Sequence, residues 1–236
     1  MFTATPLTEK GDYFGYTTRL GSNSRHWFKR PKLLKDPVIA FVGASVPKQI
    51  ADKVIELNNT NVKIVNLCVP ARDINRWIDP ADGVWSNANS VLAANGLTWE
   101  DVNVVWTMQD DLRDNGDARF PEAPESLKLK LNDFFMTLQI KFPNIAILDL
   151  ASRTYNYGTA AKHAEPSCYH TGWANKWFVE DHRRYKVYCT DRCYLWLPAE
   201  TMESHYVEDL VHYSAEGEDY WGNKVYEYYG NYEWFK

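Results

Sequence analysis

Short apolar runs alternate along the chain with longer segments in which apolar residues recur every three or four positions. Each run is rich in branched side chains and lacks the polar alternation of a strand with one exposed face. Such a run predicts a strand that is buried on both faces. The four predicted strands span residues 38–44, 63–69, 102–108 and 144–150.

The segments between and after these runs predict helices. The clearest one carries an apolar stripe at helical spacing, formed by Leu127, Leu131, Phe134, Leu138 and Phe142. Further helices are predicted at 47–59, 73–77, 86–94 and 172–181, with a last one from about 214 to about 229.

Buried strands that alternate with helices predict the α/β class, with a central parallel sheet between two helical layers. Ligands of such sheets bind beyond the carboxyl ends of the strands, so functional residues are expected directly after each strand. The alternation begins at residue 37, and we expect one domain over 37–236. Residues 1–36 are polar and punctuated by glycine and serine, which predicts an N-terminal extension that wraps the domain.

Composition narrows the classes of partner. The chain has 236 residues and a formal net charge of −5, which argues against a nucleic-acid partner because that would need a basic face. The one basic stretch, 26–35, is short and is interpreted as a solvated linker. No stretch approaches the roughly 18 apolar residues of a membrane span, and no signal-peptide pattern opens the chain. We therefore expect no membrane span. A location in the cytoplasm or on a particle is favoured, and the alternative is that the numbering begins after a signal peptide was removed.

The four cysteines are too few for a disulfide scaffold in a domain of this length. Cys189 and Cys193 lie in the motif CTDRC, and Cys168 precedes His170 by two residues, but this spacing matches no standard zinc site. Free thiols are the favoured interpretation, and a local disulfide remains open. No glycine-rich phosphate loop is present, so we predict no metal and no cofactor, and a flavin or nucleotide site is disfavoured.

Ser45 follows the first predicted strand directly, in Gly43-Ala44-Ser45. A serine at a strand-to-helix turn exposes its hydroxyl at the carboxyl edge of the sheet, where the helix N-terminus favours developing negative charge. The alternative role for this serine is a helix N-cap.

Asp209 and His212 stand three residues apart before the last predicted helix, followed by Ser214 and Gly217. A serine nucleophile needs a base within hydrogen-bond reach, and the base needs a group that fixes its tautomer. One tight loop with this spacing can supply both the base, His212, and the group that fixes its tautomer, Asp209.

A serine after the first strand, and D-x-x-H followed by S-x-x-G before the last helix, resemble the first and last motif blocks of the SGNH (GDSL-like) hydrolases. The family's G-D-S is G-A-S here, and its D-G-x-H-P-S-x-x-G is DLVHYSAEG. The usual glycine after the second strand corresponds to Ala71, and the usual G-x-N-D corresponds to TMQD at 107–110. The segments at 77–80, 104–106, 152–158 and 165–177 are similar to a less typical branch of the family.

This resemblance implies a flavodoxin-like sheet and hydrolysis of esters, often acetyl groups on carbohydrates. By the same resemblance, Ser45 is the nucleophile, His212 is the general base and Asp209 orients it. The backbone N–H groups of Ser45 and Ala71 would bind the oxyanion, with the Gln109 side-chain amide replacing the family's asparagine.

Arg153 and Glu165 are candidates for binding a polar substrate, although a structural ion pair or solvated loop charges would explain them as well. The long connection at 183–206 is predicted to act as a lid. A different class of function also fits the imperfect blocks. In that alternative, the chain is a catalytically inactive structural or binding subunit with an SGNH-type fold in a larger assembly, where a protein partner would contact it.

Overall fold

The computed structural model describes residues 36–111, 119–158, 165–182 and 186–236. The predicted extension at 1–36 therefore lies outside the described residues except for Asp36, and so do residues 183–185 of the predicted lid.

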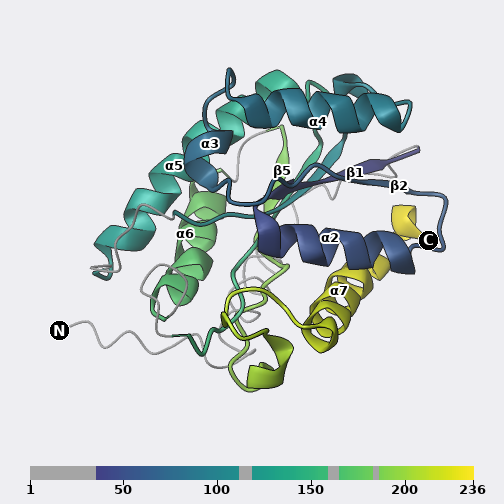
Figure 1. Ribbon diagram of the computed structural model, residues 1–236. Coiled ribbons are helices and arrows are strands. Elements are labelled where there is room, and N and C mark those ends of the chain that lie inside the picture. Colours follow the sequence, from purple (N-terminus) through teal and green to yellow (C-terminus); the bar gives the residue numbers. More distant parts are fainter. Residues whose placement is uncertain (1–35, 112–118, 159–164, 183–185) are drawn as a thin grey trace.

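A five-stranded parallel sheet forms the centre of the domain (Figure 1). Its strand order is β2-β1-β3-β4-β5, the order of flavodoxin-like folds, and this confirms the predicted fold class. The strands are β1 (Val38–Gly43), β2 (Lys63–Asn66), β3 (Val104–Met108), β4 (Ile147–Ala151) and β5 (Tyr188–Thr190). In register, Ile39 pairs with Val104 of β3, and Val104 pairs with Ile147 of β4.

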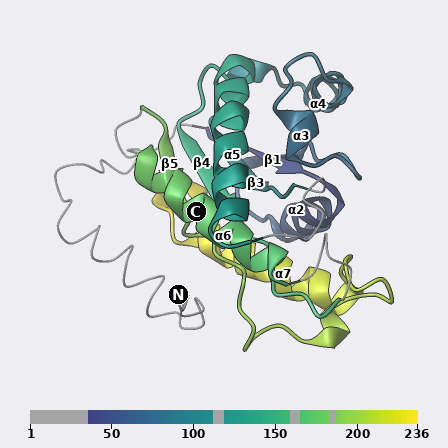
Figure 2. The same ribbon diagram turned by 90° about the vertical axis from the view of Figure 1, so that its left-hand side faces the viewer.

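Helices cover both faces of the sheet (Figures 1 and 2). One face packs against α2 (Ser45–Leu57) and α7 (Ala215–Gly230), which lie side by side. The other face packs against α3 (Ile74–Trp77), α4 (Gly83–Ala94) and α5 (Glu122–Lys141), and α6 (Ser167–Asp181) packs against α5. Short 3-10 turns occur at η1 (Trp99–Asp101), η2 (Glu203–His205) and η3 (Glu233–Phe235).

The apolar runs of the sequence are the inner strands of this sheet. All six residues of β1 are buried. Val38, Ala40 and Val42 face the α4 and α5 side, whereas Ile39 and Phe41 face the α2 and α7 side. Because successive side chains point to opposite faces, a strand with a helical layer on each side needs apolar residues at every position.

The largest differences between prediction and structure lie after β4. Helix α6 begins at Ser167, five residues before the predicted start at 172. The predicted lid at 183–206 contains β5, followed by the buried side chains of Cys193, Leu195 and Trp196. The described part of this segment is therefore a sheet edge with core contacts, and the prediction of a lid was wrong there.

Within the described ranges, no helix combines the length and the apolar character needed to cross a bilayer.

Candidate active site

Ser45 lies at the junction of β1 and α2, at the carboxyl edge of the sheet. Gly43, the last residue of β1, leaves no room for a side chain. A Cβ there would lie 2.6 Å from Pro47 Cγ and 3.1 Å from the Met108 carbonyl oxygen. Ala44 is the N-cap of α2, so Ser45 is the first helical residue and does not serve as the cap. Its hydroxyl is therefore available for another contact.

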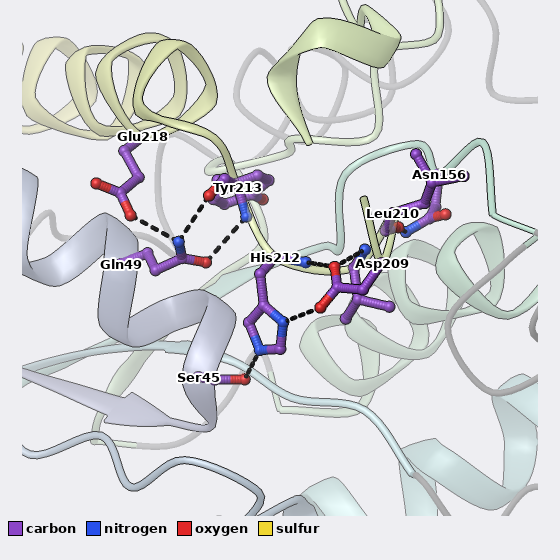
Figure 3. A network of polar contacts seen from close by, with 9 residues as sticks. Ser45, Gln49, Asn156, Asp209, Leu210, His212, Tyr213 and Glu218 are labelled. Atoms are coloured by element: carbon purple, nitrogen blue, oxygen red, sulfur yellow. Dashed lines mark hydrogen bonds and ion pairs between the residues drawn. The ribbon is translucent and has the colours of Figure 1, made fainter. Parts of the chain in front are cut away.

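That contact is with His212, as Figure 3 shows. The distance between Ser45 Oγ and His212 Nε2 is 2.8 Å. On the other side of the ring, His212 Nδ1 lies 2.6 Å from Asp209 Oδ2. The three residues predicted to form a triad thus form a continuous chain of hydrogen bonds.

A tight turn holds Asp209 against His212. Asp209 Oδ1 accepts hydrogen bonds from the backbone N–H groups of Val211 (2.8 Å) and His212 (2.9 Å). Leu210, inside the turn, adopts a left-handed φ of 52°, and its carbonyl accepts a bond of 2.6 Å from Asn156 Nδ2. The turn is therefore fixed both internally and by the loop after β4.

The charge of Asp209 sets the tautomer of the histidine. Burial raises the pKa of Asp209, but hydrogen bonds from the His212 ring and from two backbone N–H groups lower it by more. The resulting pKa is about 2. The ionised carboxylate can only accept, so Nδ1 of a neutral His212 carries the ring proton. Nε2 then has a free lone pair directed at the Ser45 hydroxyl.

Gln49 and the start of α7 connect this turn to the rest of the fold. Gln49, four residues after Ser45 on α2, exchanges hydrogen bonds with the backbone of Tyr213 (Figure 3). Ser214 caps α7 by accepting from Gly217 N, and a Cβ at Gly217 would lie 2.0 Å from the His205 carbonyl oxygen. Sequence reasoning missed Gln49, although its i, i+4 spacing from Ser45 places both residues on one helix face.

A pocket of about 330 Å³ opens beside Ser45 and His212. Its wall combines apolar residues near the serine with one ion pair. The lining residues are Ala44, Ser45, Val46, Pro47, Pro70, Ala71, Met108, Asp110, Arg153, Val211 and His212.

Ala71 stands where the motif blocks of SGNH hydrolases usually have glycine. It adopts a left-handed φ of 58°. Its loop is tied to neighbouring strand ends by bonds from Val69 N to the Gly43 carbonyl (2.9 Å) and from Ile74 N to the Asp110 carbonyl (3.2 Å). Both predicted backbone donors, Ser45 and Ala71, therefore belong to residues of the pocket wall. The N-terminal N–H groups of a helix such as α2 also lack partners within the helix.

Gln109 is placed differently from the prediction. Its Nε2 donates a hydrogen bond of 2.9 Å to Thr107 Oγ1, and Gln109 does not line the described pocket. Side chains alternate along an extended chain, and the residues on either side of it, Met108 and Asp110, are the ones that line the pocket. The structure therefore argues against the predicted role of Gln109 as an oxyanion donor.

Of the two residues predicted to bind substrate, Arg153 lines the described pocket and Glu165 does not. Arg153 lines the pocket and pairs with Asp110, which sequence reasoning did not single out. Burial lowers the pKa of the Arg153 guanidinium, but the Asp110 carboxylate beside it raises the pKa by more, so the arginine stays charged.

Glu165 lies outside the wall of that pocket. Its carboxylate accepts hydrogen bonds from Trp196 Nε1 (2.8 Å) and from the backbone N–H groups of Asn156 and Tyr169 (both 3.2 Å). Burial raises its pKa despite these bonds. Glu165 thus braces the loop after β4, and the prediction that it binds substrate is not supported.

The four cysteines are free thiols, and all are buried. Cys193 Sγ accepts a hydrogen bond of 3.2 Å from Trp106 Nε1, and burial raises the thiol pKa of both Cys189 and Cys193. In the part of the chain that the structure describes, no group of three or more histidine, cysteine or acidic residues could hold a metal ion.

Comparisons with known proteins show likeness at the level of the fold. No protein-family model matches the chain, and no curated protein matches its sequence. A Streptococcus pneumonia protein described as a platelet activating factor matches with a TM-score of 0.55 and 15% identity, covering 92% of this chain and 94% of its own. The aryl esterase of M. smegmatis matches with a TM-score of 0.50 and 12% identity, covering 82% and 98%. A Slackia heliotrinireducens protein described as an SGNH hydrolase matches with a TM-score of 0.49 and 14% identity, covering 82% and 98%.

Proposed function

We propose that this chain, which has the fold of SGNH-type hydrolases, cleaves carboxylic esters through Ser45, His212 and Asp209. The single observation that carries the proposal is the hydrogen-bonded chain from Ser45 Oγ to His212 Nε2 (2.8 Å) and from His212 Nδ1 to Asp209 (2.6 Å). This arrangement joins a nucleophile, a base and an orienting carboxylate at the carboxyl edge of a parallel sheet, where such folds bind ligands.

In the first half of the reaction, Ser45 Oγ attacks the ester carbonyl carbon while His212 Nε2 takes the hydroxyl proton. The resulting oxyanion would accept hydrogen bonds from the backbone N–H groups of Ser45 and Ala71. The intermediate then breaks its bond to the alcohol oxygen, and His212 returns the proton to that oxygen. The alcohol leaves, and the acyl group stays on Ser45.

In the second half, His212 removes a proton from water, and the hydroxide attacks the acyl carbon. The Ser45–acyl bond breaks, the proton returns to Ser45, and the carboxylic acid leaves. Asp209 stays ionised throughout because its pKa is about 2. Its charge stabilises the imidazolium that forms in both halves.

Acylated carbohydrate, with acetyl as the acyl group, is the substrate class that we propose. The wall beside Ser45 contains Val46, Pro47 and Met108, which suits a small apolar acyl group. The same pocket contains charged hydrogen-bonding groups on Asp110 and Arg153, which suit a hydroxylated alcohol.

The alternative is a catalytically inactive structural or binding subunit with an SGNH-type fold in a larger assembly. One observation favours it: Gln109 donates to Thr107, and none of the described residues in the pocket wall supplies the side-chain amide donor usual in SGNH hydrolases. Under this alternative the triad geometry would persist without a productive oxyanion site.

Labelling with a fluorophosphonate probe and mass mapping of the modified residue separates the two proposals. We expect label on Ser45 in the folded protein and none in Ser45→Ala. Ser90→Ala, which changes an exposed serine of α4, is the matched control and should label like the wild type. Folded wild-type protein without label on Ser45 would exclude the hydrolase and favour the inactive subunit.

A further inference from the structure

The ion pair of Arg153 and Asp110 lies in the wall of the pocket that contains Ser45. We propose that this pair is a specificity subsite that binds a hydroxyl group of an uncharged, polyhydroxylated alcohol, next to the ester that Ser45 attacks. The inference rests on the proposed ester hydrolysis and adds the residues that select the alcohol.

The pair is built with one open side. Arg153 Nη1 contacts Asp110 Oδ2, and within the described ranges the hydrogen bonds of the Asp110 carboxylate are confined to that oxygen. Arg153 Nε has no hydrogen-bond partner among the described residues either. Both residues are largely buried, with exposed fractions of 8% for Arg153 and 6% for Asp110.

Buried polar groups in folded proteins nearly always have hydrogen-bond partners, so a ligand hydroxyl that enters this pocket can take the place of water at the open side of the pair. The Asp110 oxygen outside the pair can accept a hydrogen bond, and the Arg153 guanidinium that lines the same pocket carries donors. A hydroxyl group both donates and accepts, which matches this arrangement, whereas a ketone or ether oxygen can use only the donor.

The charges favour an uncharged ligand over an anionic one. Arg153 and Asp110 cancel formally, and no other lysine or arginine lines the described pocket. The Cys168 thiol interacts with Arg153, but burial raises its pKa to about 12, so it remains neutral and Asp110 is the counter-ion. An anionic alcohol would lose hydration without gaining a free cation, and the ionised Asp209 beside His212 would repel it.

The backbone on both sides of the subsite is anchored. Arg153 N donates a bond of 2.8 Å to Thr171 Oγ1 of α6, and the Asp110 carbonyl accepts from Ile74 N at 3.2 Å. Ser152 Oγ accepts from the backbone N–H groups of Leu195 (2.8 Å) and Trp196 (3.0 Å). Groups held in this way lose little entropy on binding, so they can discriminate between ligands.

The first test compares two acetyl esters on purified protein. A mono-O-acetylated methyl glycoside with a free neighbouring hydroxyl carries the feature that the subsite binds, and 4-nitrophenyl acetate lacks it. In Asp110→Asn we expect kcat/KM for the glycoside to fall roughly 10- to 100-fold, mostly through KM, because the charged acceptor becomes a neutral amide whose NH2 group cannot accept. The rate with 4-nitrophenyl acetate should change by less than about 3-fold, since that ester makes no such bond.

Asp110→Asn leaves a buried arginine unpaired and could fail to fold, so the double variant Asp110→Leu/Arg153→Met is measured beside it. Replacing a buried ion pair with apolar residues of similar volume is often tolerated. The double variant should lose kcat/KM for the glycoside and keep its rate with 4-nitrophenyl acetate. Lys128→Met/Asp181→Asn, which removes an ion pair between α5 and α6 away from the pocket, is the matched control and should leave both esters unaffected. An equal loss for both esters, or no loss, overturns the subsite.

Binding to an inactive variant separates this inference from the proposed hydrolysis. Titration of Ser45→Ala with the acetylated glycoside, followed by nuclear magnetic resonance, should show binding that weakens at least about 10-fold in Ser45→Ala/Asp110→Asn. This result supports the subsite even if the wild type hydrolyses neither ester, in which case the proposed function alone fails. Absence of binding to Ser45→Ala, or equal binding by both variants, overturns the subsite even if Ser45 proves reactive.

Discussion

Gln49 and Tyr213 exchange two hydrogen bonds, one in each direction. Gln49 Nε2 donates to the Tyr213 carbonyl oxygen at 2.9 Å, and Tyr213 N donates to Gln49 Oε1 at 3.0 Å. Gln49 lies one helical turn after Ser45, and Tyr213 follows His212 directly. The pair therefore joins the helix that carries the proposed nucleophile to the loop that carries the proposed base (Figure 3).

For this reason we expect Gln49→Ala to act on the rate of the chemical step. Losing the pair frees the His212 loop and leaves two peptide groups of Tyr213 without their partner, so kcat should fall roughly 10-fold with little change in KM. Steady-state kinetics with 4-nitrophenyl acetate measure both constants. Gln139→Ala, which alters an exposed glutamine of α5, should behave like the wild type. A Gln49→Ala variant with a lower melting temperature and an unchanged kcat would make Gln49 a purely structural residue.

Removing the base should cost more than removing the acid that orients it. We expect His212→Ala to lower kcat by roughly 10³-fold or more and Asp209→Ala to lower it by a smaller factor, since the carboxylate acts only through the ring. Both side chains are partly exposed, so the variants should remain folded by circular dichroism. If Asp209→Ala proved as damaging as Ser45→Ala while His212→Ala stayed active, the assigned roles would be wrong.

Gln109 provides a third prediction, now opposite to the one that the family resemblance implies. Because its amide bonds to Thr107 at 2.9 Å, Gln109→Ala should reduce the free energy of unfolding by about 1 kcal/mol and leave kcat close to the wild-type value. Chemical denaturation and steady-state kinetics measure the two quantities. A 10-fold loss of kcat at unchanged stability would restore Gln109 to the oxyanion site.

Titration of Asp149 should make the free energy of unfolding depend on pH. This carboxyl of β4 is buried and accepts hydrogen bonds of 2.8 Å from Tyr228 and Tyr229. Burial raises its pKa from 3.8 to about 7, although the two tyrosine bonds oppose the shift. Between about pH 4 and pH 7 the folded state keeps a proton that the unfolded state has lost. The stability from this group is complete below pH 4 and is lost as the pH rises to about 7, at about 1.4 kcal/mol per pH unit.

Asp149→Asn should remove this loss, because an amide does not titrate, and one tyrosine hydroxyl can still donate to its oxygen while the other accepts from its NH2 group. Urea denaturation of the wild type and the variant at pH 4, 5, 6 and 7 gives the difference directly. Asp133→Asn, on the exposed side of α5, should reproduce the wild-type curve. Parallel curves for the wild type and Asp149→Asn would show that the buried carboxyl does not titrate in this range.

The parts of the fold that could be predicted from sequence are those with strong local patterns. Residues 38–44 form an uninterrupted apolar run because β1 has a helical layer on both sides, and Ser45 could be placed because it ends that run. β5 was missed because three residues, Tyr188–Thr190, are too short to show a period. Asp209 and His212 could be paired in advance because one tight turn contains both.

The missed or misplaced site residues depend on contacts between distant segments or on strand phase. Asp110 and Arg153 follow different strands, and only the sheet brings them into one pocket wall. For Gln109, position in the motif and alternation along the strand give opposite predictions, and the structure follows the alternation. The period of two puts Gln109 on the side opposite to Met108, and that rule was available from the sequence.

The hydrogen bond between Ser45 and His212 joins residues that are 167 positions apart in the chain. During synthesis the ribosome releases Ser45 and its helix long before the segment that carries His212. The growing chain can therefore build most of the sheet while the serine still lacks its base, and a translation product that stops short of residue 209 would have no triad. Reactivity of Ser45 would thus report that the segment with His212 has been made and has docked.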